Sequence, residues 1–303
     1  MKMRVLITGA TGLIGTEIVK LCHNKNIAVN YLTTSPSKLT KDENYKGFLW
    51  NPSKNEIDTD CIKDVDAIIN LVGATISKRW TDTYKKEIIL SRTQSTQLLF
   101  NTLQNNPHHI KQIISASAIG VYPDSLTNYY TEDETSISSS FLGQVVEKWE
   151  HAVDAFKEIG VEVTKVRIGL VLSKKGGALP QMAKPFKFGL GAALGSGKQW
   201  QSWIHITDLA RLFLHVLEEE LTGVYNAVAP NPETNQALSK QIAKTLNMPF
   251  FLPNVPRFVL KLVLGEMHIL LFESQRVSSK KIEDTGFDFK YYNLKNALET
   301  ELK

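Results

Sequence analysis

Cysteine is scarce in this chain of 303 residues. It holds only two, Cys22 and Cys61, which leaves no spacing for a disulfide framework or a cysteine-based metal site, although one disulfide stays open. We therefore expect no metal centre, and a reducing, cytoplasmic compartment fits best. The first residues contain no long apolar stretch, so we expect no leader, and the sequence has no run of about 18 apolar residues, the length that a membrane-spanning helix needs. We expect no membrane partner.

Charge of one sign is not concentrated anywhere either. The net charge is +4, from 35 basic and 31 acidic residues, and the basic residues form scattered pairs such as Lys85-Lys86 and Lys174-Lys175. A basic stripe or tail is the usual signature of a protein that binds nucleic acid, so we expect no nucleic-acid partner.

Apolar runs and amphipathic segments alternate through the first two-thirds of the chain. We expect strands at 4–8, 28–33, 47–50, 67–71, 112–117 and 161–167, and helices at 14–23, 81–103 and 141–158. This alternation predicts an α/β fold, with a Rossmann-type doubly wound parallel sheet covered by helices on both faces.

The pattern changes after residue 169. Residues 174–200 are rich in Gly, Lys and Pro, a helix is expected at 208–218 and a strand at 224–228, and the chain from 230 onward is mainly helical, with a core helix at 258–264. We predict an NADP-binding Rossmann domain at 1–170, with 203–229 returning to the sheet. A smaller, mainly helical C-terminal substrate domain would comprise 171–202 and 230–303.

A glycine loop follows the first expected strand. Residues 8–15 read T-G-x-x-G-x-x-G between a strand and a helix, a spacing typical of dinucleotide binding. The first glycine allows a sharp turn, the second lets the backbone approach a pyrophosphate, and the third permits close packing of the helix on the strand. The helix N-terminus then presents N–H groups to the phosphates. The expected contacts are Gly9, Thr11, Gly12, Leu13, Ile14 and Gly15.

The end of the second expected strand bears on which cofactor is used. It carries no carboxylate for the ribose 2′-hydroxyl of NAD, and instead offers Thr33, Thr34, Ser35 and Lys38, which suit a 2′-phosphate. We therefore expect NADP(H), with NAD(H) the less favoured cofactor, although these are also ordinary turn residues. Further cofactor contacts are expected at neighbouring strand ends, from Leu71, Val72, Gly73 and Ser115.

Several segments together resemble the extended short-chain dehydrogenase/reductase superfamily. They include ITGATGLIG at 7–15, NLVGATI at 70–76, SRTQST at 91–96 and ISASAIGVY at 114–122. Further segments, GLGAALGSGKQWQSWIHITD at 189–208, NAVAPNPETN at 226–235, LGEM from 264 and SQRV ending at 277, resemble more closely its atypical branch, the epimerase family with its own C-terminal domain. Members of the superfamily use a serine and a Tyr-x-x-x-Lys pair, so the resemblance implies that Ser117 hydrogen-bonds a substrate carbonyl or hydroxyl.

The chain departs from that pattern on the next helix. Phe141 and Val145 stand where the tyrosine and lysine are expected, and neither can exchange a proton; with Trp149 they share one helix face, which indicates core packing or a pocket wall. Tyr122 and His205 are the remaining candidates for proton transfer. For Tyr122 the alternative is a half-buried ring with its hydroxyl in water, and for His205 a structural hydrogen bond.

Two further features stay open at this point. Arg167 ends an expected strand and could meet an anionic group or form a structural ion pair. The loop at 195–200 could cover the substrate or be a surface turn.

Two functions are consistent with these residues. The first is an NADP(H)-binding oxidoreductase or epimerase-like enzyme with an unknown small-molecule substrate and a non-standard proton donor. The alternative is a regulatory or redox-sensing protein that binds NADP(H) and catalyses little. A homodimer could form through the helices at 81–103 and 141–158, and a monomer stays open.

Overall fold

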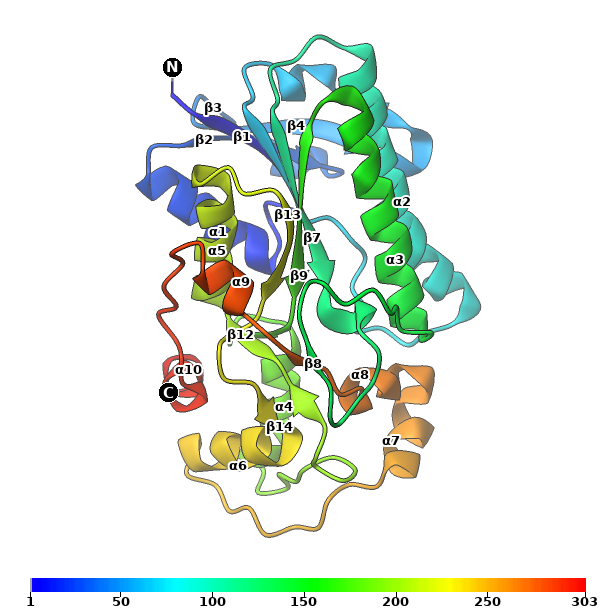
Figure 1. The fold of residues 1–303 in the computed structure, drawn as a ribbon, viewed down its shortest axis with the longest axis vertical. Coiled ribbons are helices and arrows are strands. Elements are labelled where there is room, and N and C mark those ends of the chain that lie inside the picture. Colours follow the sequence, from blue (N-terminus) through cyan, green and yellow to red (C-terminus); the bar gives the residue numbers. More distant parts are fainter. Residues whose placement is uncertain (1) are drawn as a thin grey trace.

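A computed structural model describes residues 2–303 and is built around one large sheet (Figure 1). Within these residues nine strands form the sheet, in the spatial order β13 (Gly223–Ala227), β9 (Glu162–Ile168), β7 (Gln112–Ala118), β6 (Ala67–Asn70), β1 (Arg4–Thr8), β2 (Ala28–Thr33), β4 (Tyr45–Asn51) and β3 (Lys41–Asp42), with β5 (Glu56–Ile57) also pairing with β4. Only the pairs that β3 and β5 make with β4 are antiparallel. The predicted doubly wound parallel sheet is confirmed.

The strand order reverses between β1 and β6. From β1 the chain moves to β2 and β4 on one side, and then returns to β6, β7, β9 and β13 on the other. At such a switch point the loops leave the carboxyl ends of adjacent strands in opposite directions, and a crevice opens between them.

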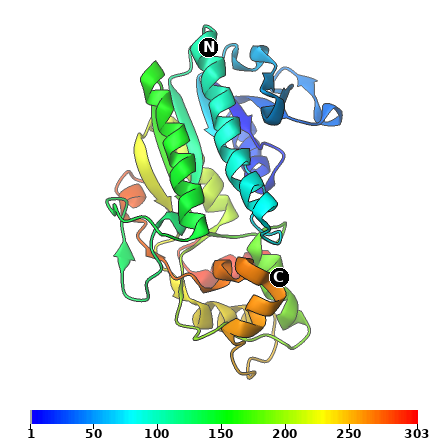
Figure 2. The ribbon, with the colours of Figure 1, turned by 90° about the vertical axis from the view of Figure 1, so that its right-hand side faces the viewer.

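Helices cover both faces of the sheet, as the continuous apolar strands require. On one face α1 (Leu13–Asn24) packs against α5 (Ile206–Glu218). On the other, α2 (Asp82–Asn105) and α3 (Phe141–Asp154) run side by side (Figure 2). The main apolar core fills the space between these helices and the sheet.

A second apolar core lies below the sheet in Figure 1. It is built mainly from α4 (Ala178–Lys187), α6 (Asn235–Thr245), α10 (Leu294–Leu302) and the parallel pair β10 (Leu170–Leu172) and β12 (Trp203–His205). The strand expected at 224–228 does rejoin the sheet, as β13. The segment at 203–205 does not, because β12 pairs with β10; β11 (Trp200–Gln201) likewise pairs with β14 (Glu233–Thr234).

Part of the C-terminal region returns to the main sheet. β15 (Arg276–Val277) pairs with β8 (Tyr129–Tyr130), and α9 (Lys280–Glu283) packs on β13. Ile282, Phe287 and Phe289 belong to the main core. The sequence places all of 230–303 in the smaller domain, so the structure differs here.

The apolar helix expected in the core at 258–264 is at the surface instead. In α7 (Arg257–Leu264) the side chains of Phe258 and Leu262 are 66% and 79% exposed, and α8 (Ile269–Phe272) follows after a single 3-10 turn. An apolar run in the sequence predicts neither which elements a helix packs against nor how deeply its side chains are buried. Within residues 2–303, no helix combines the length and the apolar character needed to cross a membrane.

Candidate functional site

The glycine loop joins β1 to α1 at the switch point of the sheet. Gly9 has a φ of +70°, in the left-handed region that side chains rarely adopt. A Cβ on Gly15 would lie 2.2 Å from the carbonyl oxygen of Gly9. Only a glycine at position 15 therefore allows α1 to pack this close to the loop. The close contact is thus with the loop itself, whereas the sequence suggests packing on the strand.

The N-terminus of α1 is left open. Its N-cap is Gly12, which has no side chain to accept a hydrogen bond from the first turn, whereas Thr81 caps α2 and Ser140 caps α3 in this way. The first-turn N–H groups of a helix have no partner within the helix, and they carry partial positive charge. Thr11 and Gly12 are exposed, and Leu13 and Ile14 half-buried. This arrangement fits a pyrophosphate.

A buried polar network fixes the strand ends beneath the loop. The Thr8 hydroxyl donates to Asn70 Oδ1 (2.7 Å) and accepts from the backbone N–H groups of Leu71 (3.0 Å) and Val72 (3.2 Å). Asn70 Nδ2 in turn donates to Ser115 Oγ (3.2 Å). Ser115 is fully buried, which corrects its expected role as a cofactor contact: its hydroxyl ties β7 to β6.

The carboxyl end of β2 offers hydroxyls and one amine to the adenosine side of the crevice. Thr33 is buried, and its hydroxyl accepts from the Ser35 N–H (3.1 Å), so this side chain shapes the turn. Thr34 and Lys38 are exposed and Ser35 half-buried; among residues 2–303 the Lys38 amine forms no ion pair. Thr34, Ser35 and Lys38 remain able to meet a 2′-phosphate.

Leu71, Val72 and Gly73 follow β6 on the other side of the switch point. The two apolar residues are half-buried and Gly73 is exposed. A Cβ on Gly73 would lie 2.8 Å from Cζ of Arg92, so the glycine leaves room for that guanidinium.

A cavity of about 200 Å³ adjoins this crevice, between the carboxyl ends of β7 and β9 and the C-terminal region. Its apolar wall includes Leu142, Val145 and Trp149, which confirms the pocket-wall interpretation for two positions of the α3 face. Phe141 packs instead against Trp80, with ring centroids 5.0 Å apart. Trp200, from the end of the expected covering loop, also lines the cavity together with Gln201. Among residues 2–303, the charged side chains in the lining are Arg92 and Glu273.

Ser117 and Tyr122 lie behind this wall in a buried network. Ser117 donates to Glu150 Oε1 (2.6 Å), and Tyr122 donates to Asn226 Oδ1 (2.8 Å) while accepting from Arg167 Nη1 (3.0 Å). Neither side chain lines the cavity, since Ser117 is 3% exposed and Tyr122 fully buried. The structure therefore corrects two expectations: a Ser117 hydroxyl directed at substrate, and a Tyr122 hydroxyl near the nicotinamide or in water.

The centre of that network is an ion pair. Arg167 donates from Nε to Glu150 Oε1 (2.8 Å) and from Nη2 to Oε2 (2.9 Å). Burial alone would raise the pKa of Glu150, but the Arg167 guanidinium and the Ser117 hydroxyl hold it below its ordinary value. Burial raises the pKa of Tyr122, with Arg167 opposing the shift. The sequence leaves two roles open for Arg167, binding an anionic group or forming a structural ion pair, and the structure shows the ion pair.

His205 has a structural position too. Its Nδ1 accepts from the Thr207 N–H (3.1 Å) at the start of α5, its Nε2 lies 3.0 Å from Glu301 Oε1, and its ring stacks on Tyr291 with centroids 3.7 Å apart. Burial lowers the pKa of His205, against the attraction of Glu301 and Asp208. His205 does not line the cavity, so its proposed part in proton transfer is corrected to the structural hydrogen bond.

Sequence reasoning missed Arg92 and Glu273. Arg92 belongs to the SRTQST segment, where an arginine on a long helix gives no sign of facing inward. Glu273 follows α8, far away in the chain, and no local pattern relates the two.

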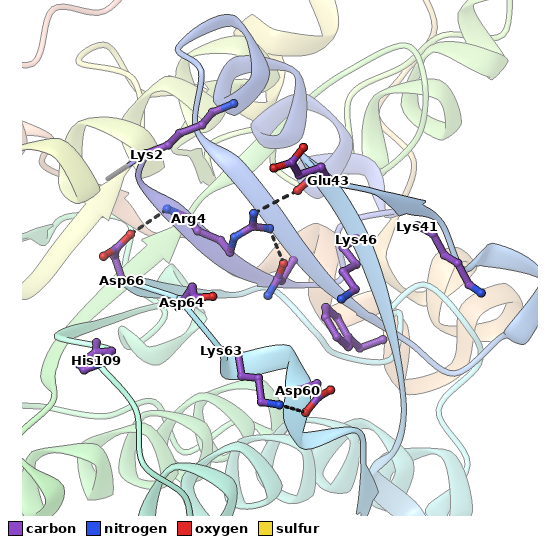
Figure 3. Close-up of a pocket in the computed structure, with 12 residues that line it drawn as sticks. Lys2, Arg4, Lys41, Glu43, Lys46, Asp60, Lys63, Asp64, Asp66 and His109 are labelled. Atoms are coloured by element: carbon purple, nitrogen blue, oxygen red, sulfur yellow. Dashed lines mark hydrogen bonds and ion pairs between the residues drawn. The ribbon is translucent and has the colours of Figure 1, made fainter.

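A larger hollow of about 720 Å³ lies at the opposite, amino edge of the sheet (Figure 3). Some of its charged side chains already have partners: Arg4 donates to Asn30 Oδ1 (2.9 Å) and to the Glu43 carbonyl (3.1 Å), and Lys63 pairs with Asp60 (2.7 Å). The hollow is remote from the glycine loop, and we do not assign the cofactor or substrate to it.

Comparisons with known proteins agree with this geometry. The profile of the NAD dependent epimerase/dehydratase family matches residues 5–227, and that of a domain of unknown function (DUF1731) matches residues 255–301. An epimerase family protein of Staphylococcus saprophyticus is 40% identical over 299 residues, 97% of each chain. The crystal structure of the human epimerase family protein SDR39U1 (isoform 2) with NADPH superposes with a TM-score of 0.85, at 32% identity and 99% coverage of each chain. The crystal structure of a nucleoside-diphosphate sugar epimerase from Corynebacterium glutamicum is 26% identical and superposes with a TM-score of 0.78. The alignment covers 100% of this chain and 58% of the epimerase chain.

Proposed function

The chain belongs to the NAD dependent epimerase/dehydratase family, in its atypical extended branch with an added C-terminal domain, and we propose that it is an NADP(H)-dependent oxidoreductase or epimerase-like enzyme. The observation that supports this most is the uncapped N-terminus of α1, set over the glycine loop at the switch point of the sheet. The human relative with NADPH supports the choice of NADP(H) over NAD(H).

Two groups of residues would hold the cofactor. The backbone N–H groups of Leu13 and Ile14 would bind the diphosphate, since that of Gly12 already donates to the Gly9 carbonyl (2.9 Å), and Thr34, Ser35 and Lys38 would bind the 2′-phosphate. When bound, the nicotinamide supplies hydride transfer at its C4 atom. The small cavity beside the crevice would take the substrate, in a wall of apolar side chains that excludes water.

The proton chemistry of this enzyme would differ from the Tyr-x-x-x-Lys scheme. We propose that no equivalent of that pair operates, because Phe141 and Val145 occupy the expected positions on α3. Ser117, Tyr122 and His205 are engaged elsewhere. A proton donor must therefore come from the cavity lining or from the substrate itself.

The engagement of those three side chains also favours the second candidate, an NADP(H)-binding regulatory or redox-sensing protein. The cavity argues for the enzyme, since a sensor needs no substrate pocket beside its cofactor. Turnover of a carbonyl substrate with oxidation of NADPH would decide for the enzyme. Tight cofactor binding without any turnover across a broad screen would decide for the sensor.

The first experiment is calorimetric titration of cofactor-free protein with NADPH and NADH. We expect tighter binding of NADPH. Lys38→Glu should weaken NADPH binding by about tenfold, because an exposed charge-assisted contact is lost and a repulsive charge is added, and should leave NADH binding no weaker. Lys111→Glu is the matched control, since this exposed lysine precedes β7 at the opposite edge of the sheet. Binding of neither cofactor would refute the proposal, and equal binding of both would refute the NADP(H) preference.

A further inference from the structure

Arg92 is a half-buried cation that lacks an anionic partner. It lies on α2 with its guanidinium at the cavity wall, where Cζ is 5.0 Å from the centroid of the Trp149 ring. Among residues 2–303, no carboxylate lies within ion-pair distance of it. Burial lowers the pKa of Arg92 to about 10, still far above neutral pH, so the group stays charged. A buried charge without a counterion is costly, and proteins usually keep one for a ligand.

The hydrogen bonds of Arg92 leave one edge of the guanidinium unused. Nη1 donates to the carbonyl oxygens of Ile88 (2.9 Å) and Ala74 (3.3 Å), which anchors the group without neutralising it. A guanidinium has five N–H donors, so those on Nε and Nη2 remain. Neither atom has a hydrogen-bond partner among the described residues, and Arg92 contributes to the lining of the cavity.

The same chain shows what this edge is suited to bind. Arg167 uses its Nε and Nη2 atoms to hold both oxygens of Glu150, at 2.8 and 2.9 Å. This side-on, bidentate geometry matches a carboxylate. In Arg92 the corresponding edge has no protein carboxylate.

The cavity limits the size and character of the ligand. Its volume of about 200 Å³ lies below the 300–1,000 Å³ or so of sites for drug-sized molecules, so the occupant is small. Apart from Arg92 and Glu273, the lining is mostly apolar, with Ile76, Val146 and Leu270 among its members. The ligand should therefore combine one anionic group with a short apolar body.

Glu273 is the one group in the cavity that could oppose an anion. Gln275 Nε2 donates to it (3.4 Å), and it forms no ion pair with Arg92. Burial raises the pKa of Glu273, assisted by the nearby charge of Asp124 and opposed by Arg257 and by hydrogen bonds.

We propose that Arg92 binds the carboxylate of a small substrate with an apolar body, through its Nε and Nη2 atoms. This assignment rests on the proposed function, because it identifies the substrate as the carboxylate-bearing carbonyl or hydroxyl compound that would react beside the nicotinamide. Trp149 and the carbonyl oxygens of Ile88 and Ala74 fix the plane of the guanidinium, so that binding requires little reorganisation.

The test uses pairs of ligands of similar shape, of which one is anionic and the other uncharged. Purified full-length protein, with and without saturating NADP+, is titrated with two matched pairs: pyruvate against biacetyl, and α-ketoisocaproate against acetyl isovaleryl. Each pair exchanges a carboxylate for an uncharged acetyl group. We expect the acid of at least one pair to bind about tenfold or more tightly than its neutral partner, as a bidentate charge-assisted contact predicts.

Variants then assign the effect to Arg92. Arg92→Met keeps an apolar stem beside Trp149 and should abolish the preference for the acid, whereas Arg92→Lys should retain part of it. Lys86→Met, on the exposed side of the same helix, is the control. Circular dichroism checks that each variant is folded, and the comparison of acid with neutral partner in the unaltered protein does not depend on any variant.

The outcomes separate this inference from the proposed function. If NADPH binds but each acid binds no better than its neutral partner, Arg92 has no carboxylate role while the cofactor assignment stands. If Arg92→Met weakens NADPH binding as much as binding of the acid, the guanidinium serves the cofactor phosphates and the inference is overturned. If NADPH itself fails to bind, the proposed function is refuted.

Discussion

Replacing Arg167 by methionine would leave the buried Glu150 carboxylate with the more distant Lys165 amine, 3.7 Å from its Oε2, as counterion. Arg167 and Glu150 are each 8% exposed, and two hydrogen bonds of 2.8 and 2.9 Å join them. Methionine fills part of the same space but neutralises nothing. Because Lys165 offsets the remaining carboxylate only in part, the variant should lose about 3 kcal/mol of folding free energy at neutral pH, at the lower end of the range for a broken buried pair.

The size of this loss should depend on pH. In the unaltered protein the pKa of Glu150 lies below its ordinary value, so the ionised pair stabilises the fold above the pKa of the unfolded chain. That contribution disappears as the pH falls through the lowered pKa. In Arg167→Met, burial should raise the pKa of Glu150 against the weaker attraction of Lys165, so the folded variant takes up a proton at a higher pH than the unfolded chain. Acidification therefore shrinks the difference between the two proteins.

Urea unfolding followed by circular dichroism would measure both effects. The loss should be largest near pH 7 and clearly smaller near pH 5. The double variant Glu150→Gln/Arg167→Met, which removes both charges, should be more stable than Arg167→Met at pH 7. A loss below about 1 kcal/mol, or one that is equal at the two pH values, would refute the view that this pair is a desolvated structural charge pair.

Three further predictions concern the loop, the network and the thiols. Gly15→Ala should lower the free energy of unfolding in urea by at least about 2 kcal/mol and weaken NADPH binding in calorimetry, because its Cβ would lie 2.2 Å from a main-chain oxygen of the glycine loop. Unchanged values for both would contradict the geometry. Ser117→Ala should lower stability by about 1.5–3 kcal/mol through its lost bond to Glu150, and full stability with abolished turnover would instead make its hydroxyl catalytic. Burial raises the pKa of Cys22 and Cys61 to about 12, so neither thiol should react with Ellman's reagent before urea unfolds the protein. Rapid labelling of the folded protein would show instead that the sites around these thiols open to solvent.

Local patterns were sufficient where local chemistry decides the structure. The strands expected at 4–8 and 28–33 are β1 and β2 with the same bounds, since a short, mostly apolar run between turn residues fits a strand covered on both faces. The glycine loop was likewise predictable, because its spacing reports the backbone geometry directly.

Local sequence patterns do not predict which elements and side chains pack together in the folded protein. The short apolar run at 203–205 suits any parallel neighbour, and the choice of β10 over the main sheet depends on how the chain passes between two cores. Ser117 was placed correctly at a strand end, but its hydroxyl is directed by Glu150 and, through it, by Arg167. Arg92 faces the cavity only because α2 packs with Trp149 of α3.

The return of the C-terminal region to the main sheet has a consequence for how such proteins diversify. The two family profiles suggest separable modules at 5–227 and 255–301, yet Ile282, Phe287 and Phe289 belong to the core of the first. Exchanging the C-terminal module between relatives would exchange part of the Rossmann core with it. We therefore expect recombination at that boundary to succeed only between parents whose core residues match. The substrate domain of such proteins would then vary mainly by single substitutions within an intact chain.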